Sequence, residues 1–564
     1  MVSNGTTKER NNNKRNAIPS TNIAGEFWCW PAQDGLEAVS RAPRGTMAKG
    51  GSMLLRRGSK RGSGRGPGPT LRDYSLTGPQ AAAALAAGLA DARWYQPPID
   101  PERLRALMER ENRRPARDTA LWAALLAGTG MAAFMSLRRR SRWAIAAFAA
   151  FGALYGGSAD ARWHENGHGT AFKAKWANDA VYHVASFMLL REPTLWRWSH
   201  FRHHSDTIIV GRDAEISYPR PTKLVPLVLN YLNLVNGPRM LLRTIQHAAG
   251  RIDGTTRELV PPEDLPRLVR EARVHMAVLG AAVAGAVISG TVVPLLFVGL
   301  PSFYGAWLLV FFGITQHAGL REDVLDHRLN TRTVYMNPVF RFLYLNMNYH
   351  LEHHLFPSVP YYNLPQLHQE IKAYLPSPKP SVMAAYREII HALRQQRRDP
   401  TWELPLPELP GGPFQPPSRV EPAAGPAGTV GSNEADALAP TPGDGADEVV
   451  DLGPVEGVGI GGVRRVDVDG HVYALYRPEE DKFALTDGLC THAQAELSEG
   501  HLDGCVIECP KHNGRFDVRT GEAVRRPATR PLQAYPVEVV GGRLVAWLTP
   551  TTADTRRRLV KDRA

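Results

Sequence analysis

The sequence predicts a multidomain protein, with an α-helical membrane domain of about four transmembrane helices and then a small all-β domain. Three observations support this prediction. Long apolar runs alternate with short histidine-rich boxes between residues 119 and 375. A Pro-, Gly- and Ala-rich stretch at 400–446 is typical of a linker. After it, short Val-rich segments alternate with glycine turns over 447–549, which is typical of β-strands. A chain of 564 residues is long enough for both domains.

The first 72 residues predict a disordered basic arm. They contain 13 of the 67 Lys and Arg residues but only 4 of the 55 Asp and Glu residues, so most of the net charge of +12 lies there. Such a composition cannot bury enough apolar surface to offset chain entropy. It fits either a transit peptide or an arm near anionic lipid, and it lacks the apolar segment of a secretory signal. Residues 550–564 form a basic tail, and no nucleic-acid partner is expected.

Residues 73–399 are expected to form the membrane domain. The alanine-rich segment 81–95 and the segment 101–112, which begins with proline, predict two helices ahead of the membrane. The apolar runs Ala120–Met135 and Trp143–Gly157 then predict a first hairpin of membrane spans.

The apolar stretch Met276–Gln316 is long enough for a second hairpin, with its turn near 299–302. Two shorter apolar segments, Ala180–Leu190 and Leu224–Leu234, are expected to lie in the membrane interface or to cover the site. Residues 361–397 have the pattern of amphipathic helices, which would complete a cytosolic helical cap.

Two hairpins would place all the histidine boxes, both termini and the β domain on one side of the bilayer. Most long basic segments lie on that side, so the sequence predicts an integral, multi-pass membrane protein with these parts in the cytoplasm. The cluster Arg138–Arg142 would then face outward, against the usual tendency of basic residues.

Three short boxes, HENGHG, HFRHH and NYHLEHHLFP, hold eight of the nineteen histidines. Each box contains two histidines four residues apart, which share one face of a helix. Burying imidazoles without partners is costly, whereas a metal ion would take their nitrogen atoms as ligands. The box histidines are His164, His168, His200, His203, His204, His350, His353 and His354.

A ninth histidine, His317, ends the last apolar run and is expected at the same membrane surface. Nine imidazoles exceed one tetrahedral zinc site, so they predict two metal ions with positions left open for O₂. Three carboxylates are candidates to orient the ligand N–H groups, or are ordinary surface groups: Glu165, Asp213 and Glu352. Single histidines elsewhere are predicted to be solvated or hydrogen-bonded, namely His183, His247, His275, His327, His368, His391, His471 and His501.

Residues 119–375, through these boxes, resemble the membrane fatty acid desaturase superfamily. The resemblance implies an O₂-dependent oxidoreductase that removes hydrogen from an unactivated C–H bond of a hydrophobic, acyl-like substrate. Desaturation is the expected reaction. Hydroxylation of a lipid, alkane, sterol or other hydrophobic substrate is the alternative, and a membrane redox carrier without substrate chemistry is a third possibility. Gly313 stands one turn before His317, where some relatives have Asn. The resemblance implies that two irons are bound by His164, His168, His200, His203, His204, His317, His350, His353 and His354.

The C-terminal region contains a second candidate metal site, formed by Cys490, His492, Cys509 and His512. Two Cys and two His can hold a Rieske 2Fe–2S cluster or a zinc ion. The flanking sequence CPKHNGRFDVRTGEAVRRPATRPLQAYPV resembles a Rieske ferredoxin. The two cluster loops lack the extra cysteines of respiratory Rieske proteins, and Cys505 is expected to be a core residue.

The Rieske resemblance implies that this domain is a tethered electron donor, because a linker raises its local concentration at the paired irons. The glycine-rich segment 457–462 is not followed by a helical pattern, so it does not predict a dinucleotide site. A separate NAD(P)H-dependent ferredoxin reductase is therefore implied.

Overall fold

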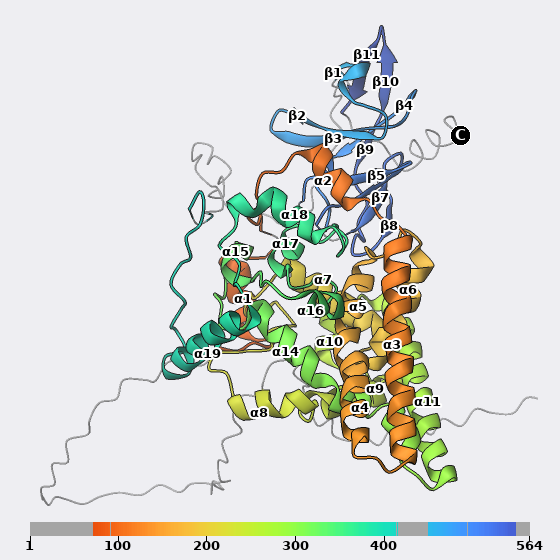
Figure 1. The fold of residues 1–564 in the computed structure, drawn as a ribbon. Helices are drawn as coiled ribbons and strands as arrows, with labels where there is room; N and C mark the ends of the chain where they lie inside the picture. The colour runs from red at the N-terminus through yellow and green to blue at the C-terminus, as the bar shows by residue number, and fades with distance from the viewer. Residues whose placement is uncertain are drawn as a thin grey trace, which may run out of the picture.

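The computed structural model describes residues 72–90, 92–412, 414, 449–492, 495–511 and 513–548. It consists of a helical domain followed by a β domain, which confirms the predicted order of the two fold classes (Figure 1). The β domain lies against one end of the helical domain, and α3, α4 and α11 extend away from it toward the other end. Four features predicted from the sequence lie outside the described residues: most of the basic arm, most of the linker, the basic tail and His512.

The first predicted hairpin is present as two long helical segments. One is α3 (Arg113–Arg138); the other is a nearly continuous rod of α4 (Trp143–Gly152), a π-helical turn (Ala153–Ser158) and α5 (Ala159–His168). The rod ends where Gly169 adopts a left-handed φ of 70°, which closes the helix after the first histidine box.

The second predicted hairpin is built differently. Helix α11 (Leu265–Ser289) ends at Gly290, whose left-handed φ of 64° starts the chain reversal. The returning chain is broken into α12 (Val293–Phe297), α13 (Pro301–Tyr304) and α14 (Ala306–His317). The turn predicted at 299–302 was therefore wrong: those residues form a break in the returning segment, because Pro301 starts a new helix there.

Among the described residues, two helical segments are long and apolar enough to cross a membrane, judged by length and composition: Arg113–Arg138 and Pro262–Ser289. The rod of α4 and α5 and the returning segment of α12, α13 and α14 do not contain a single helix that is long and apolar enough by this criterion. The arrangement of four spans stays a prediction.

Shorter helices surround the ends of these long ones. The predicted helix 81–95 is shorter than expected, because Gly88 takes a left-handed φ of 72° soon after α1 ends. The helices are α1 (Pro79–Ala86), α2 (Pro101–Met108), α6 (Lys175–Met188), α7 (Pro193–Ser205), α8 (Leu224–Leu229), α9 (Asn236–Ala248), α10 (Gly254–Leu259), α15 (His327–Asn330), α16 (Pro338–Leu343), α17 (His350–Leu355), α18 (Leu364–Ile371) and α19 (Val382–Arg398). Short 3₁₀ turns lie at Asn230–Leu232, Pro262–Asp264, Lys372–Tyr374, Val455–Gly457 and Leu497–Glu499.

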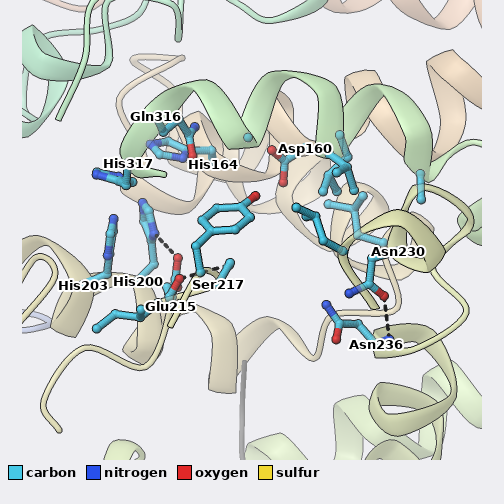
Figure 2. A pocket seen from close by; sticks show the side chains of 18 of the residues that line it. Asp160, His164, His200, His203, Glu215, Ser217, Asn230, Asn236, Gln316 and His317 are labelled. Atoms are coloured by element: carbon cyan, nitrogen blue, oxygen red, sulfur yellow. Dashed lines mark hydrogen bonds and ion pairs between the residues drawn. The ribbon is translucent and has the colours of Figure 1, made fainter. Parts of the chain in front are cut away.

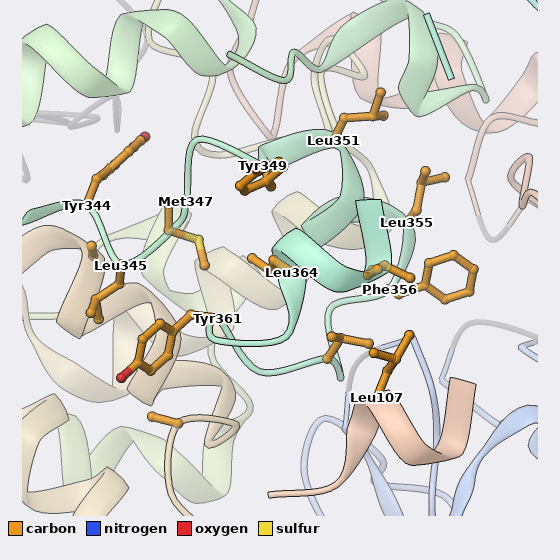
Figure 3. Close-up of a cluster of buried hydrophobic side chains, with 14 of the residues drawn as sticks. Leu107, Tyr344, Leu345, Met347, Tyr349, Leu351, Leu355, Phe356, Tyr361 and Leu364 are labelled. Carbon is orange, nitrogen blue, oxygen red and sulfur yellow. The ribbon is translucent and has the colours of Figure 1, made fainter. Parts of the chain in front are cut away.

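The third histidine box lies inside a hydrophobic cluster that fixes its helix in place (Figure 3). Leu351 and Leu355 lie four residues apart on α17, and both are buried in the cluster that also contains Leu364 of α18 and Leu107 of α2. The apolar face of α17 therefore anchors the helix, and its histidine face is left to point inward.

The β domain contains antiparallel sheets, which in the described residues have the strand orders β1-β11-β10, β2-β3-β4-β9 and β5-β6-β7-β8. Cys505 lies in the turn between β5 and β6, half-buried and packed against the core of the β domain, so the prediction of a core residue is confirmed only in part. The strands are β1 (Val449–Pro454), β2 (Gly462–Val468), β3 (His471–Glu479), β4 (Lys482–Asp487), β5 (His501–Asp503), β6 (Val506–Glu508), β7 (Arg515–Asp517), β8 (Ala523–Arg525), β9 (Ala534–Tyr535), β10 (Val537–Val540) and β11 (Arg543–Trp547).

Candidate metal centre

All nine predicted histidines converge in the interior as two adjacent groups. Within each group the candidate ligand atoms lie within 4.8 Å of one another. The first group takes residues from all three boxes, and the second adds His317. In the described part of the chain the groups are His164, His168, His200, His204 and His353, and His203, His317, His350 and His354.

The helices divide the boxes between the two groups. His164 and His168 lie one turn apart on α5 and join the same group. On α7, His200 and His204 belong to the first group, whereas His203 belongs to the second. The third box is divided in the same way, so α7 and α17 each contribute to both groups.

The ring nitrogens face one another at distances that suit a bound cation. In the first group, Nε2 of His164 lies 2.7 Å from Nε2 of His353, and Nε2 of His168 lies 3.1 Å from that of His200. An ion about 2.1 Å from two imidazoles at a right angle holds their nitrogens about 3 Å apart. One ring N–H can serve only one neighbour, whereas Nε2 of His353 lies close to those of both His164 and His204 (3.2 Å for the latter), so proton sharing cannot satisfy every lone pair of the group. The donor set therefore fits a metal ion in each group.

The outer nitrogens of four histidines are bonded, which aims their Nε2 lone pairs inward. Nδ1 of His203 donates to Asp213 (2.9 Å), and Nδ1 of His317 donates to the backbone carbonyl of Asn330 (2.8 Å). Nδ1 of His200 lies 3.2 Å from Glu215, and Nδ1 of His354 lies 3.2 Å from the hydroxyl of Thr207. Such partners fix the tautomer that a metal ligand needs.

Of the three predicted orienting carboxylates, the structure places one against a box histidine. Asp213 bonds His203, whereas Glu165 accepts bonds from Thr170 and from the backbone of Tyr361. Glu352 bonds His368, with a 2.5 Å contact to its Nδ1. The predictions for Glu165 and Glu352 were wrong, because each carboxylate lies one residue from a ligand on the helix and so points to a different side.

Sequence reasoning missed Glu215 and Thr207. Glu215 follows Asp213 by two residues in a turn after α7, and its backbone N–H donates to Asp213. Its position beside a candidate orienting residue is the signal that could have identified it. Thr207 carries no comparable signal, because it reaches His354 only through the tertiary fold.

Burial holds most of these imidazoles in the neutral form. Desolvation, followed by repulsion from neighbouring imidazoles, lowers the pKa of His164, His204 and His354 well below the ordinary value. Burial also lowers the pKa of His203, but Asp213 outweighs that effect and raises it. Neutral imidazole is the form that binds metal ions.

A cavity of about 150 Å³ opens onto both histidine groups (Figure 2). His200, His203 and His317 lie at one end, and Asn230 and Asn236 lie at the other. The segment that contains Asn230 was predicted either to lie in the membrane interface or to cover the site; it lines this cavity. Apolar lining comes from Leu189, Leu227, Met240, Leu309 and Val310, and hydrogen-bonding groups come from Asp160, Ser217, Tyr218, Asn230, Asn236 and Gln316.

One candidate cluster loop of the β domain, the one with Cys509, faces the helical domain. Cys490 and Cys509 are buried, and His492 is partly buried. The hydroxyl of Ser358, four residues after His354, donates to the backbone carbonyl of Pro510 (2.7 Å) and accepts a bond from Asn513 (3.1 Å). One loop of this site therefore contacts the chain just after the third histidine box.

Two further contacts connect the domains at the metal centre. Arg525 donates to the backbone carbonyl of His168 over 2.8 Å. Trp94 stacks on His327 with 4.3 Å between ring centroids, and His327 lies 5.1 Å from the ring of His354. Lys511, in the Cys509 loop, lies over the ring of Trp94, with 6.0 Å between its Nζ and the ring centroid. A line of packed groups thus runs from the Cys509 loop to His354.

Comparison with known proteins assigns the two domains separately. Residues 141–386 match the family model described as "Fatty acid desaturase", and residues 448–536 match the "Rieske" 2Fe–2S domain model. The ferredoxin component of a naphthalene 1,2-dioxygenase system from Pseudomonas aeruginosa is 48% identical over 85 residues, which cover 15% of this chain and 81% of the relative. The ferredoxin component of a p-cumate 2,3-dioxygenase system from Pseudomonas putida is 43% identical over 99 residues, or 17% and 83% of the two chains.

Two solved ferredoxin structures are similar to part of this chain. The ferredoxin of carbazole 1,9a-dioxygenase from Nocardioides aromaticivorans IC177 is 34% identical, with a TM-score of 0.18, and the match covers 18% of this chain and 98% of the ferredoxin. The ferredoxin of Sphingomonas yanoikuyae B1 is also 34% identical, with a TM-score of 0.18 and coverage of 18% and 100%.

Proposed function

The chain joins a fatty acid desaturase domain to a C-terminal Rieske 2Fe–2S domain, and on this premise we propose an O₂-dependent diiron oxidoreductase that acts on a membrane lipid. The favoured reaction is the introduction of a C=C bond into an acyl-like chain. The Rieske domain would be the fused electron donor, reduced in turn by a separate NAD(P)H-dependent ferredoxin reductase.

The observation that carries this proposal is the convergence of nine imidazoles into two groups. Two irons held there would activate O₂ for removal of hydrogen from a C–H bond. Asp213, Glu215 and Thr207 would orient the ligands, and the cavity would position the substrate against His164, His203 and His317.

Desaturation removes two electrons from the substrate, whereas reduction of O₂ to two waters takes four. Two electrons must therefore come from outside, and a Rieske cluster passes one at a time. The bonds of Ser358 and Arg525 support the Rieske domain as the source, because they place its loops against segments that carry His354 and His168. A carrier without substrate chemistry would not need a cavity at the histidines.

Hydroxylation is the second candidate reaction, and the polar lining of the cavity favours it. Tyr218, Asn230 and Asn236 offer neutral hydrogen-bonding groups beside the apolar wall. An alcohol product would find partners there that an alkene would not use.

The two long apolar helices support membrane association. We extend this to a multi-pass protein with the histidine groups and the Rieske domain on the cytoplasmic side, as the charge pattern suggests. The substrate would then enter from the bilayer.

The test is His353→Ala in the full-length protein, supplied with reductase, NAD(P)H and a lipid extract. The loss of one buried ligand should remove iron from the diiron site and abolish the lipid product, while the Rieske absorption stays unchanged. His391→Ala is the matched control, because that histidine lies on α19 and belongs to neither group. Full product formation by the His353 variant would refute the proposal, and its absence with normal iron content would refute the ligand assignment.

A further inference from the structure

A second cavity, of about 360 Å³, lies where the β domain meets the helical domain. Its wall on one side comes from α6 and the start of α7, with Arg267 of α11. Its wall on the other side comes from Arg515 of β7 and from Arg525 and Arg526 at the end of β8. None of the nine histidines of the candidate metal centre lines this cavity.

The cavity is separate from the one that opens onto the histidines, although helix α7 borders both. Arg197 and Phe201 face the domain boundary, whereas Trp196, His200 and His203 face the histidine cavity. Residues three or four apart share a helix face, so α7 presents one face to each cavity. A ligand at the boundary would therefore not reach the substrate position.

The second cavity is strongly basic. Among the described residues, eight Lys and Arg side chains line it, against two carboxylates, Asp179 and Asp264. The cations come from both domains: Lys173 and Arg197 belong to the helical domain, and Arg525 to the β domain. Such an excess of one charge around an enclosed space attracts an ion of the opposite sign.

The carboxylates near the cavity are shared among several cations. Glu508 is almost fully buried and is contacted by Arg110, Arg515 (2.6 Å) and Arg525 (3.8 Å). Asp179 is shared by Lys175 (2.5 Å) and Arg197 (3.4 Å). Asp264 and Glu263 pair with Arg526, and Glu271 pairs with Arg267. Among the described residues, the eight cations of the lining still outnumber the five carboxylates that line the cavity or pair with those cations.

We propose that this cavity binds a phosphate-bearing anion, which bridges the guanidinium groups of the two domains. Arginine presents planar pairs of N–H donors that match phosphate oxygens, and phosphate accepts several such pairs at once. An anion held by Arg197 from one side and by Arg525 from the other would stabilise the docked position of the Rieske domain.

Helix α6 brings the cavity close to a candidate lipid surface. Lys175, Asp179 and Tyr182 line the cavity, while Trp176 and Val184, on the neighbouring face, are 77% and 55% exposed. Exposed tryptophan is typical of a membrane interface. The phosphate could thus belong to a lipid headgroup or to a soluble ion, and the two sources can be separated by experiment.

The test uses the full-length protein in neutral detergent. One arm titrates potassium pyrophosphate against potassium chloride at equal ionic strength and follows binding by calorimetry. The other arm follows binding of dioleoyl phosphatidic acid by native mass spectrometry, with dioleoylglycerol as the matched lipid without phosphate. We expect saturable binding in at least one arm. Binding of pyrophosphate without binding of phosphatidic acid would identify a soluble ion as the ligand, and the reverse would identify a lipid headgroup.

Two variants test the site itself. The double variant Arg197→Gln with Lys173→Gln should weaken binding at least tenfold. If that variant does not fold, Lys173→Gln with Lys175→Gln replaces it; this pair changes two exposed side chains and should also weaken binding. Lys482→Gln is the control, because its ion pair with Glu479 lies on the β3–β4 hairpin. No binding in either arm, or equal binding by wild type and variants, would overturn the proposal. Because pyrophosphate binding requires no turnover, this result is independent of the diiron chemistry.

Discussion

At the level of single residues, the candidate metal centre depends on the partners of the outer ring nitrogens. Asp213 is fully buried and bonds His203, the backbone N–H of Ile208 and the backbone N–H of Glu215. One carboxylate therefore fixes both a histidine tautomer and the path of the chain after α7.

Asp213→Asn should weaken iron binding by about 10- to 100-fold, because the amide no longer offers a charged acceptor to His203. The measurement is the iron retained after dialysis against a chelator, corrected for the iron of the Rieske cluster. Glu258→Gln, a change at an exposed ion pair with Arg202, should retain iron as the wild type does. Equal retention by both variants would show that Asp213 does not support the site.

His247 shows the ordinary role that the sequence suggests for an isolated histidine. It is fully buried between Glu192 (2.8 Å) and Asp253 (3.1 Å), where it connects α9 to the start of α7 and to the cap of α10. Burial lowers its pKa, but the bonds to Asp253 and Glu192 outweigh this effect and raise it above the ordinary value.

Since the folded pKa of His247 is raised, its contribution to stability is complete below about pH 6.5 and is lost as the pH rises through the folded pKa. Thermal unfolding of wild type should therefore occur at a lower temperature as the pH rises above 6.5. In His247→Gln this part of the pH dependence should disappear, and stability below pH 6.5 should fall by about 1–3 kcal/mol. Identical pH profiles for the two proteins would contradict this role.

At the level of elements, the π-helical turn Ala153–Ser158 positions the first histidine box. Glycines let this turn approach α13 and α14 closely: a Cβ on Gly156 would lie 2.5 Å from the carbonyl of Pro301, and one on Gly157 would lie 2.5 Å from Leu308. Since α5 follows the turn and α14 ends at His317, this contact sets the distance between the two helices that carry His164 and His317.

Gly156→Ala should destabilise the protein by about 1–3 kcal/mol and reduce the iron content, because the backbone of Pro301 cannot yield to the added methyl group. Gly128→Ala on α3 is the matched control: its Cβ would meet no atom within 4 Å, so a small gain of about 0.5–1 kcal/mol is expected. The thermal unfolding midpoint and metal analysis provide the measurements. A neutral Gly156 variant would show that the close approach is not required.

At the level of the whole molecule, docking of the β domain is supported by an ion pair that is buried. Arg110, just after α2, bonds the buried Glu508 of β6, which Arg515 and Asn513 also contact. Exposed ion pairs contribute little to stability, whereas a buried charge that loses its partner is costly.

Arg110→Gln should weaken docking by about 2 kcal/mol, because Glu508 loses a buried partner from the other domain. The expected result is slower reoxidation of the reduced Rieske cluster by O₂ and lipid, with an unchanged cluster spectrum. Arg543→Gln removes an exposed pair with Asp451 within the β domain and should leave the rate unchanged. If both variants reoxidise at the wild-type rate, the Arg110 contact is not needed for electron delivery.

Local patterns in the sequence were sufficient to identify the nine histidines and the order of the two domains. Spacing of three and four residues determines which side chains share a helix face, and this depends only on helix geometry. The same reasoning failed for Glu165 and Glu352, because a residue adjacent to a ligand points to a different side of the helix. It also misplaced the turn of the second hairpin: the chain reverses after α11 at Gly290, whereas Gly299 and Pro301 interrupt the returning segment.

The sequence by itself determined which residues can hold metal and which part of the chain carries the Rieske motif, since both are encoded by residue type and short spacing. Only the tertiary structure decided how the nine imidazoles divide into two groups, that Glu215 and Thr207 support them, and that arginines from two domains enclose one cavity. Those relations join residues far apart in the chain, and they depend on how the helices pack and not on any local pattern.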